Sequence, residues 1–481
     1  MEPATTIVVQ SDLDLLLLVP PGLGRRAGLE EALRRAIRTG ALQAGARLPS
    51  SRVLAADLNV SRGTVVGAYD QLAAEGWITI RPASGTVVAE APLLHVGVGE
   101  RLPLEAEAIH PRHDLRPGRP EYGSFPRTAW AAAVRSVLAL APHDIWDYGQ
   151  RFGRPELRRE LAAYLGRVRG VLIDPGRLVV CAGFSHGLGL VASLLAPGPI
   201  AVEEFALARS RATLEHHGHT LVPIPVDDHG AVVDMLDRLD PTPRAVLLTP
   251  AHQYPLGSTL SPGRRHEVLR WAIHHDAIVI EDDYDGEFRY DRQSVGALQG
   301  LDPNRIVYGG TASKTLAPAL RLGWFALPAT MASNLDVVTS SARLECPVPV
   351  IDQLALAEML RCGAYDRHVR RMRLRYHRRR DELLHRLATN AQRAAVTGIA
   401  AGLHAVVRLP AGVDEASVLA ACAARQVAVG GLRTDAHLSR NLRRGDVPEG
   451  IIVGYATPAA HAFGAAIDAF TAALSDAGLG Q

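Results

Sequence analysis

The chain has 481 residues, of which 47% are apolar and 21% charged, and its formal net charge is +2. This is enough apolar sequence for two to four folded domains, and the near-neutral charge excludes attraction of nucleic acid or membrane through the overall field. Four widely separated cysteines and an apolar run that stops at Pro20 argue against disulfides, a signal peptide and a membrane span, so we expect a cytoplasmic protein.

Residues 1–90 are predicted to form a small domain of three helices followed by two strands. Apolar residues recur at helical spacing in three groups: Leu29, Leu33 and Ile37, then Leu54 and Leu58, then Val65, Tyr69 and Leu72. The Ser50-Ser51 pair caps the second helix and Ser61 caps the third, whereas residues 77–80 and 86–88 are typical of two strands joined by a tight loop. This order of elements is that of a winged helix-turn-helix.

Three segments of this domain closely resemble the GntR family of bacterial regulators. They are Gly40–Arg52 (GALQAGARLPSSR), Leu54–Thr64 (LAADLNVSRGT) and Ala68–Trp77 (AYDQLAAEGW). The resemblance implies that Arg52 and Arg62 contact DNA. It also implies phosphate or base-edge contacts from Ser51, Ser61 and Thr64, and a wing that Gly85 allows to enter the minor groove.

The charge of this domain leaves a second interpretation open. Residues 1–90 contain nine arginines and nine acidic residues, which is less basic than a typical DNA-binding domain. A winged helix that contacts other proteins is the alternative. We expect double-stranded DNA as the partner, bound by two copies acting together, because Arg52 and Arg62 occupy positions that a reading face needs.

Residues 91–113 are predicted to be a linker. Prolines, glycines and scattered acidic residues occur there without a helical or strand period. The small domain is therefore expected to be tethered, with an adjustable position relative to the rest of the chain.

Residues 114–481 are predicted to be a large α/β domain. Short apolar runs typical of buried strands alternate with amphipathic helical segments; the runs are 178–181, 200–203, 245–248, 277–281 and 305–308. This alternation predicts a mainly parallel sheet covered on both faces, with ligands at the carboxyl ends of its strands. We expect Asp282 and the segment around Lys314 to lie at those ends.

Lys314 is the only lysine in the chain, whereas the other 51 basic residues that are counted with it are arginines. Arginine cannot act as a neutral amine, so a single lysine indicates chemistry that needs one, such as a Schiff base to a carbonyl cofactor. An arginine-biased composition that left one lysine by accident is the alternative. No glycine-rich dinucleotide or P-loop motif is present, which leaves pyridoxal 5′-phosphate (PLP) as the cofactor to consider.

Two segments of the large domain are similar to fold-type I aminotransferases: Val279–Phe288 (VIEDDYDGEF) and Gly310–Gly323 (GTASKTLAPALRLG). The arrangement resembles still more closely the MocR-type GntR regulators, in which a winged helix is fused to an aminotransferase-like body with large and small subdomains. Further matches include Arg169–Val171 and Thr249–Gly257, so the resemblance covers nearly the whole chain.

The resemblance implies a role for each matching residue. Lys314 would carry PLP as a Schiff base, Asp282 would pair with the pyridine nitrogen, and Tyr284 would bind the phenolic oxygen. The phosphate would be bound by Arg321, Thr311, Ser313 and the helix N-terminus at Phe184 and Ser185. Asp282 has an alternative as a solvated acid within the acidic run of residues 281–285.

Two positions depart from the aminotransferase pattern. Tyr254 stands where an aminotransferase usually has asparagine, and Leu207 stands where relatives stack an aromatic ring on the cofactor. His252 and Gln253 lie nearby as candidate substitutes for the asparagine, and Phe205 stands two residues before Leu207, which leaves the ring stack in doubt. The strand at 451–455 also lacks the arginine that aminotransferases place before it to bind a substrate carboxylate, which argues against efficient transamination.

Other residues keep two interpretations. Tyr148 either reaches the phosphate of a partner subunit or is a core tyrosine, and Arg209 matches a position at which some relatives bind an effector carboxylate. The arginines from Arg367 to Arg380 form either a solvated helix face or a second DNA contact. The histidines at 216–219 and 274–275 have no carboxylate at useful spacing, so we expect no metal site.

Together these features predict a PLP-dependent transcriptional regulator that forms a head-to-tail homodimer. PLP, or an amine or amino acid that reacts at the Lys314 Schiff base, would modulate promoter binding, with at most weak transaminase activity. Control of vitamin B6 synthesis, amino acid metabolism or an amine-handling pathway all fit. A working aminotransferase with an accessory winged helix and an architectural DNA-binding protein without cofactor are the alternatives.

Overall fold

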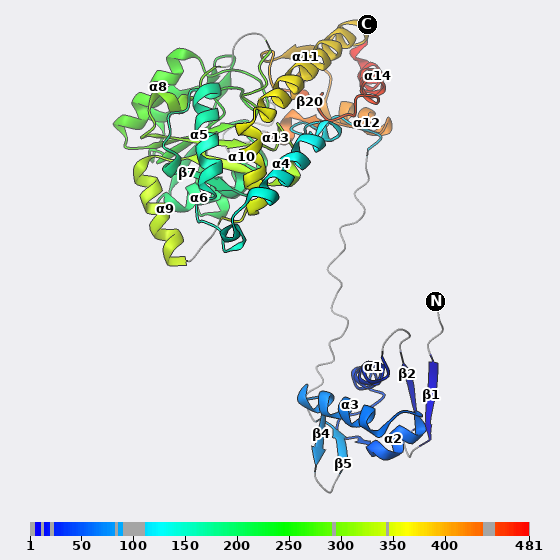
Figure 1. The fold of residues 1–481 in the computed structure, drawn as a ribbon. Coiled ribbons are helices and arrows are strands. Elements are labelled where there is room, and N and C mark those ends of the chain that lie inside the picture. Colours follow the sequence, from blue (N-terminus) through cyan, green and yellow to red (C-terminus); the bar gives the residue numbers. More distant parts are fainter. Residues whose placement is uncertain are drawn as a thin grey trace. The chain divides into compact units, whose positions relative to one another are not determined.

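The computed structural model describes residues 5–10, 14–19, 24–81, 85–89, 111–290, 295–342, 346–435 and 448–480. The chain divides into two compact units, residues 1–108 and 109–481, which are described separately (Figure 1). Most of the predicted linker and the tip of the predicted wing, residues 82–84, lie outside the described residues. In the described ranges, no helix is both long and apolar enough to cross a membrane.

The N-terminal unit has the predicted order of helices and wing strands. Its elements are α1 (Arg25–Arg38), β3 (Arg47–Leu48), α2 (Ser51–Asp57), α3 (Arg62–Ala74), β4 (Ile78–Arg81) and β5 (Gly85–Val88). The three predicted apolar groups meet in one core, with Leu58 at its margin. The side chains of Ser50 and Ser61 accept hydrogen bonds from the backbone N–H groups of Val53 and Thr64, and so cap α2 and α3.

The first residues form a hairpin that was not predicted. Strands β1 (Thr5–Gln10) and β2 (Asp14–Val19) pair as an antiparallel hairpin. The run of leucines that ends before Pro20 therefore belongs to a strand, and the period of two that marks most strands is hidden by its uniform composition.

The large unit, called the body below, is built on a seven-stranded sheet. The strands in spatial order are β7 (Leu178–Cys181), β15 (Gly323–Ala326), β14 (Ile306–Thr311), β13 (Ile278–Asp283), β12 (Ala245–Leu248), β8 (Pro199–Glu203) and β9 (Thr220–Ile224). All are parallel except β15, which runs antiparallel between β7 and β14. The mainly parallel sheet is as predicted, and β15 is an addition.

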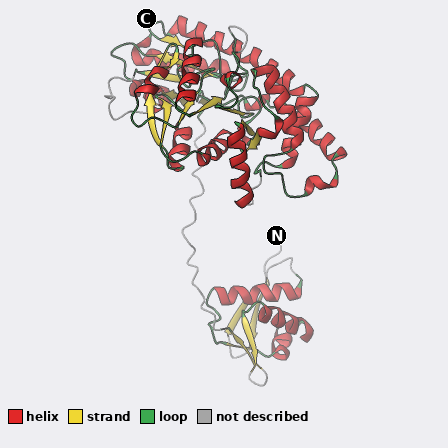
Figure 2. Cartoon of the chain, turned by 90° about the vertical axis from the view of Figure 1, so that its left-hand side faces the viewer, coloured by secondary structure: helices red, strands yellow, loops and turns green. Residues whose placement is uncertain are grey.

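Helices cover both faces of this sheet, because successive strand residues point to opposite sides. Leu178 and Val180 pack with the helices of one face, whereas Val179 and Cys181 pack with those of the other. The first face carries α4 (Arg127–Leu140), α5 (Pro155–Arg169), α8 (Pro262–His274) and α10 (Val350–Arg361), and the second carries α6 (Phe184–Leu194) and α9 (Ala329–Ala342). Figure 2 shows strands inside this shell of helices.

A smaller antiparallel sheet forms the second part of the body. Its strands in spatial order are β16 (Ala395–Thr397), β17 (His404–Arg408), β20 (Gly450–Gly454) and β19 (Gly430–Gly431). It packs with α12 (Glu415–Ala424) and α14 (Phe463–Leu474), while β6 (His113–Asp114) pairs with β18 (Val427–Ala428) beside it. The long helix α11 (Ala364–Asn390) contacts α10 at one end and α14 at the other, and thus joins the two parts (Figure 1).

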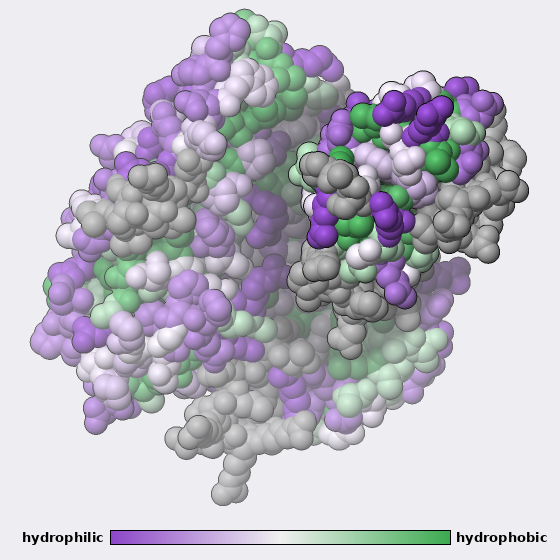
Figure 3. Space-filling view, turned by 90° about the horizontal axis from the view of Figure 1, so that it is seen from below, coloured by the Kyte–Doolittle hydropathy of each residue, from purple (hydrophilic) through white to green (hydrophobic). Residues whose placement is uncertain are grey.

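The short remaining elements lie between these. They are α7 (Ala208–His216), β10 (Val226–Asp227), β11 (Gly230–Ala231) and α13 (Leu432–Asp435). Figure 3 shows one face of each unit, on which hydrophilic and hydrophobic residues are interspersed.

Candidate cofactor site and DNA-binding face

The candidate cofactor residues gather at the carboxyl edge of the large sheet. Lys314 follows β14, His252 follows β12, and the first turn of α6 follows β7. This edge is where α/β sheets of this kind bind ligands, because the loops that leave neighbouring parallel strands converge there.

Lys314 is half-buried, and its Nζ donates a hydrogen bond to the Gly118 carbonyl oxygen at 2.5 Å. Burial lowers the pKa of Lys314, Asp285 and Asp282 act in the opposite sense, and Arg209 lowers it further. A lowered pKa raises the fraction of neutral amine, which is the nucleophilic form. Gly118 was not predicted, since no motif marks it. Its φ of +75° is the one local sign of a special position.

Asp282 lies within β13, whereas the sequence placed it just after the strand, because the strand extends two residues further than its apolar run. The Asp282 side chain is buried, and Oδ1 has no hydrogen-bond partner in the described structure. Burial raises the pKa of this carboxyl well above its ordinary range, and the nearby Lys314 opposes that rise. A buried acceptor without a donor is costly unless a ligand supplies one. Asp282 is therefore not a solvated acid.

The other acids of the predicted acidic run each have a separate buried partner. Glu281 accepts from the backbone N–H groups of Leu298 and Gln299, and Asp283 forms an ion pair with Arg169 at 2.6 Å. Asp285 Oδ2 lies 2.9 Å from His252 Nδ1. Asp282 is the member of this group that keeps a buried carboxylate oxygen without a hydrogen-bond partner in the described structure.

The substitutes for the missing asparagine are distinguished by their contacts. The Gln253 amide is occupied by backbone contacts, because Nε2 donates to the Phe205 and Tyr254 carbonyl oxygens. His252 Nδ1 instead lies 3.0 Å from the Tyr284 hydroxyl as well as against Asp285. Both partners contact the same ring nitrogen. One Nδ1–H shared between Asp285 and the Tyr284 oxygen leaves the Tyr284 hydroxyl hydrogen for the phenolic oxygen that it is predicted to bind.

The predicted phosphate-binding residues surround the N-terminus of α6. Arg321 Nη2 donates to the Ala182 carbonyl oxygen at 2.7 Å, and a Cβ on Gly183 would lie 3.0 Å from that nitrogen. Phe184 and Ser185 begin α6, so their N–H groups lie in the first turn, where helices lack intrahelical acceptors. Thr311 Oγ1 accepts from the Ser313 N–H at 3.1 Å, which places both hydroxyls in one turn.

Four peripheral predictions have mixed outcomes. Tyr148 is 86% exposed, so its interpretation as a core tyrosine is wrong. Phe205 is buried in a core cluster with Leu256, whereas Leu207 is 42% exposed, so Phe205 does not substitute for the stacking ring. Arg209 is exposed at the start of α7, and its positive charge lowers the pKa of Lys314.

These residues fit PLP on their own chemistry. A carboxylate oxygen without a donor suits the pyridine nitrogen, a lysine with lowered pKa suits the aldehyde, and an arginine beside a helix N-terminus suits the phosphate. Gly183 has a φ of +81°, which favours glycine at this position, and a Cβ there would lie 3.0 Å from the Arg321 guanidinium.

Glu203, at the end of β8, provides a pH test of this edge. It accepts from Thr249 Oγ1 at 2.5 Å and from the Thr249 N–H at 3.1 Å, and burial raises its pKa to about 7 from 4.5. Between about pH 4.5 and pH 7, the Glu203 carboxyl is therefore protonated in the folded state and ionised in the unfolded chain. This contribution to stability is fully present below the unfolded pKa and is lost as pH rises through about 7.

Glutamine cannot ionise, so Glu203→Gln should not lose this contribution. As the pH rises from about 5 to about 8, we expect the unfolding free energy of Glu203→Gln to increase relative to that of the unmodified protein by up to about 3 kcal/mol. The measurement is the urea midpoint of the cofactor-free body as a function of pH. Glu215→Gln, at an exposed position of α7, is the control. Parallel pH profiles for Glu203→Gln and the unmodified protein would contradict the assigned shift.

The predicted DNA-contacting residues gather on one side of the N-terminal unit. Arg52, Ser61 and Arg62 are exposed, and Ser51 and Thr64 are half-buried. Arg62 Nε lies 3.5 Å from Ser51 Oγ, so the N-termini of α2 and α3 present these side chains together. Gly85 begins β5 with a φ of +96°, and a Cβ there would lie 3.0 Å from Arg47 Nε.

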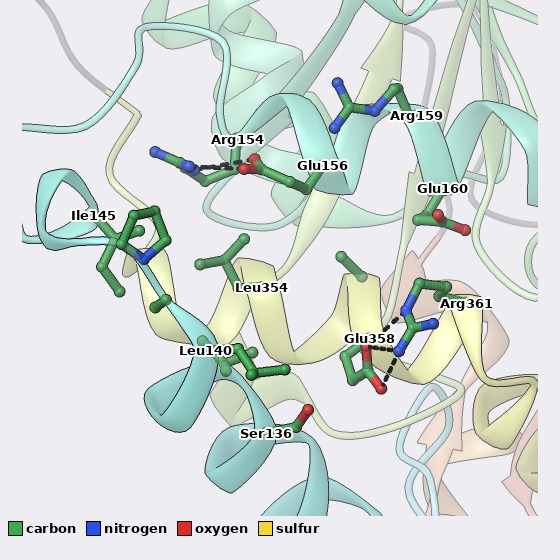
Figure 4. A pocket seen from close by; sticks show the side chains of 14 residues that line it. Ser136, Leu140, Ile145, Arg154, Glu156, Arg159, Glu160, Leu354, Glu358 and Arg361 are labelled. Carbon is green, nitrogen blue, oxygen red and sulfur yellow. Dashed lines mark hydrogen bonds and ion pairs between the residues drawn. The ribbon is translucent and has the colours of Figure 1, made fainter.

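A separate pocket of about 310 Å³ lies between α4, α5 and α10 (Figure 4). Its rim carries the ion pairs Arg154–Glu156 and Arg361–Glu358, and its floor includes Leu354. None of the predicted cofactor residues lines it, so the pocket is not part of the candidate site.

The seven-stranded sheet with one antiparallel strand, and the lysine and aspartate at its carboxyl edge, define an aminotransferase-like body, while the N-terminal unit is a winged helix. Residues 26–88 match the family model of bacterial regulatory proteins of the gntR family, and residues 114–443 match that of aminotransferase class I and II. The chain belongs to the gntR family of bacterial regulators, in its MocR-type subfamily, which joins these two domains.

Three relatives and solved structures illustrate these matches. The chain is 36% identical to the HTH-type pyridoxine biosynthesis transcriptional regulator PdxR of Corynebacterium glutamicum over 79% of this chain and 82% of that protein. It is 35% identical to the probable rhizopine catabolism regulatory protein MocR of Rhizobium meliloti, over 72% and 74%. Its fold matches a kynurenine aminotransferase of Pyrococcus horikoshii with a TM-score of 0.68 and 24% identity, over 77% and 92%.

Proposed function

We propose that this protein is a promoter-binding regulator whose body binds PLP at Lys314, and that PLP or an amine reacting with it changes DNA binding. The observation that carries the proposal is the pair formed by Lys314, with its lowered pKa, and Asp282, with its buried unpartnered oxygen. The same chain presents Arg52 and Arg62 on an exposed face of a winged helix.

PLP would supply an electrophilic aldehyde and an electron-accepting ring. Lys314 would hold it covalently, Asp282 would bind the pyridine N–H, and Tyr284 would donate to the phenolic oxygen, oriented by His252. The phosphate would be held by a group of donors: Arg321, Thr311, Ser313 and the N–H groups of Phe184 and Ser185. A cationic N–H beside Asp282 would lower again the carboxyl pKa that burial raises.

The segment that leads from the linker supports coupling between the lysine and the DNA-reading unit. Gly118 accepts from Lys314 Nζ, and Asp114, four residues earlier, pairs with Arg116 at 2.7 Å and Arg119 at 3.2 Å. A chemical change at Lys314 Nζ would therefore act on the segment 114–119 directly, through the hydrogen bond to the Gly118 carbonyl oxygen. Control of DNA binding additionally requires that the effector binds two arrangements of the protein unequally.

Arg209 supports an amino acid effector, and the exposed surface around Tyr148 supports a homodimer. Arg209 would bind a carboxylate, so an amino acid effector would be placed near Lys314 by an ion pair. Leu140, Trp146 and Tyr148 are 80%, 65% and 86% exposed within nine residues, which is an apolar surface suited to a second subunit in a head-to-tail dimer. Tyr148 would then lie close to the partner's cofactor.

Arg62→Ala is expected to abolish specific promoter binding and leave PLP uptake unchanged, because Arg62 is confined to the N-terminal unit. The measurement is a gel shift against duplex DNA from upstream of the protein's own gene, with and without PLP and candidate amines. Removing the hydrogen bonds of one arginine to a guanine edge costs about 1–3 kcal/mol, or about 5- to 150-fold in affinity for each site.

Arg35→Ala is the matched control, since Arg35 is exposed on α1 of the same unit and outside the predicted reading face. Binding that survives in Arg62→Ala, or that falls equally in Arg35→Ala, would contradict the DNA-reading role. Rapid multiple-turnover transamination without any DNA binding would favour an aminotransferase instead.

A further inference from the structure

Helix α11 carries an unusual density of positive charge that the cofactor site does not use. Residues 367–380 read RHVRRMRLRYHRRR, with eight arginines and no acidic residue. The arginine-bearing helices α5 and α8 differ, because glutamates (Glu156, Glu160 and Glu267) alternate with their arginines.

The structure divides these eight arginines into two groups. Arg375 and Arg379 point inward and pair with Glu121, at 2.8 Å and 3.3 Å, and Arg380 is half-buried. The other five are exposed and form what we call the α11 arginine face: Arg367, Arg370, Arg371, Arg373 and Arg378. Within the described part of the chain, no carboxylate forms an ion pair with any of these five.

The arrangement of the α11 arginine face is unfavourable for the isolated body. Arg367 lies three and four residues from Arg370 and Arg371, and Arg370 lies three residues from Arg373, so like charges are neighbours on one helix surface. Arg371 also contacts His368 Nδ1 at 3.1 Å, but a ring nitrogen does not neutralise its charge. A polyanionic partner would convert this repulsion into attraction.

We propose that the α11 arginine face is a second DNA-contacting surface, which binds the phosphate backbone of the duplex that the winged helix reads. This inference rests on the proposed DNA-binding function. The face extends over twelve residues, from Arg367 to Arg378, or roughly 16 Å of helix, which spans about five base pairs of backbone.

Two further observations favour duplex DNA as the partner. The N-terminal 90 residues have equal numbers of arginine and acidic side chains, so they supply little of the net charge that backbone binding needs. In addition, both units belong to one polypeptide, so DNA held by one unit is present at high local concentration around the other.

The test uses the full-length protein with Arg370→Gln, Arg373→Gln and Arg378→Gln combined, since these three side chains are exposed and make no hydrogen bond in the described structure. Affinity for a mixed-sequence duplex and for the upstream promoter fragment is measured as a function of salt. The slope of log Kd against log salt should fall by ~0.9 for each phosphate that the variant no longer neutralises, or up to about 2.7 per chain.

A matched variant controls for net charge. Arg159→Gln, Arg238→Gln and Arg270→Gln combined removes the same three charges from exposed positions of the body outside α11. We expect this control to keep the slope. The combined Arg370→Lys, Arg373→Lys and Arg378→Lys variant should keep most of it, because phosphate contacts accept a point charge. An unchanged slope in the glutamine variant, or an equal fall in the control, would overturn the inference.

The outcome also separates the inference from the proposed function. Suppose that Arg62→Ala loses promoter binding and that the α11 variant keeps its salt slope. The proposed promoter-binding function would then stand, and the proposed second DNA-contacting surface would be rejected. Selective loss of RNA binding, with duplex DNA unaffected, would assign the face to a different partner and would equally overturn the proposal.

Discussion

Lys314→Ala is expected to eliminate covalent attachment of PLP, and with it the visible absorbance band of the protein-bound cofactor. The reason is that Lys314 is the only lysine, so the chain offers no second ε-amine to replace it. Burial also lowers the Lys314 pKa, so a larger fraction of its Nζ is neutral and nucleophilic at neutral pH than in an exposed lysine.

The measurement is borohydride reduction of the PLP-treated protein, followed by mass mapping of the peptides. Unmodified protein should carry about one label per chain, on the peptide that contains Lys314. Ser313→Ala is the control, since it removes a predicted phosphate contact and leaves the amine. An undiminished absorbance band in Lys314→Ala would disprove the cofactor assignment, with no need for an activity assay.

Arg169→Met is expected to lower the unfolding free energy of the body by ~3–5 kcal/mol, because it leaves the buried Asp283 charge without its partner. Arg169 is 1% exposed, donates to both Asp283 oxygens, and also donates to the Val295 carbonyl oxygen at 2.8 Å. Asp283 in turn accepts from the Tyr308 hydroxyl at 2.8 Å. The network ties the end of α5 to the strand that presents Asp282.

Arg167→Met is the matched control, two residues away on the same helix. Its ion pair with Asp366 is largely solvent-exposed, so its loss should cost at most ~1 kcal/mol. Urea unfolding of both variants measures the difference. Replacing Arg169 and Asp283 together by leucine should recover part of the loss, because no unpaired charge then remains. Equal destabilisation by Arg167→Met and Arg169→Met would contradict this account.

The main architecture could be predicted because its signals are local. Buried parallel strands are short apolar runs, and the runs at 178–181 and 245–248 coincide with β7 and β12. The caps at Ser50 and Ser61 depend on residues only three positions apart. Strand β15 has a similar apolar character, but its antiparallel direction depends on the path of the chain, which composition does not encode.

The contacts within the candidate site could not be predicted because they join distant segments. Asp283 meets Arg169 across 114 positions, and Lys314 meets Gly118 across 196. From sequence alone, Glu281, Asp282 and Asp283 are equivalent members of one acidic run. Because side chains alternate along a strand, Asp282 points to the face of β13 opposite to that of Glu281 and Asp283, and so meets a different environment. The roles of Tyr284 and Arg321 remain predictions that rest on the family resemblance.

The pairing of β6 with β18 determines where the body can be separated from the rest of the chain. The His113 N–H donates to the Gln426 carbonyl oxygen, Leu115 forms hydrogen bonds with Ala428 and Gly454, and Leu115 is fully buried. The start of the body in sequence thus pairs as a strand with its C-terminal part. A recombinant body that begins at residue 114, where the aminotransferase match begins, would lack half of this strand, whereas one that begins before Pro111 would keep the strand and the Gly118 contact to Lys314.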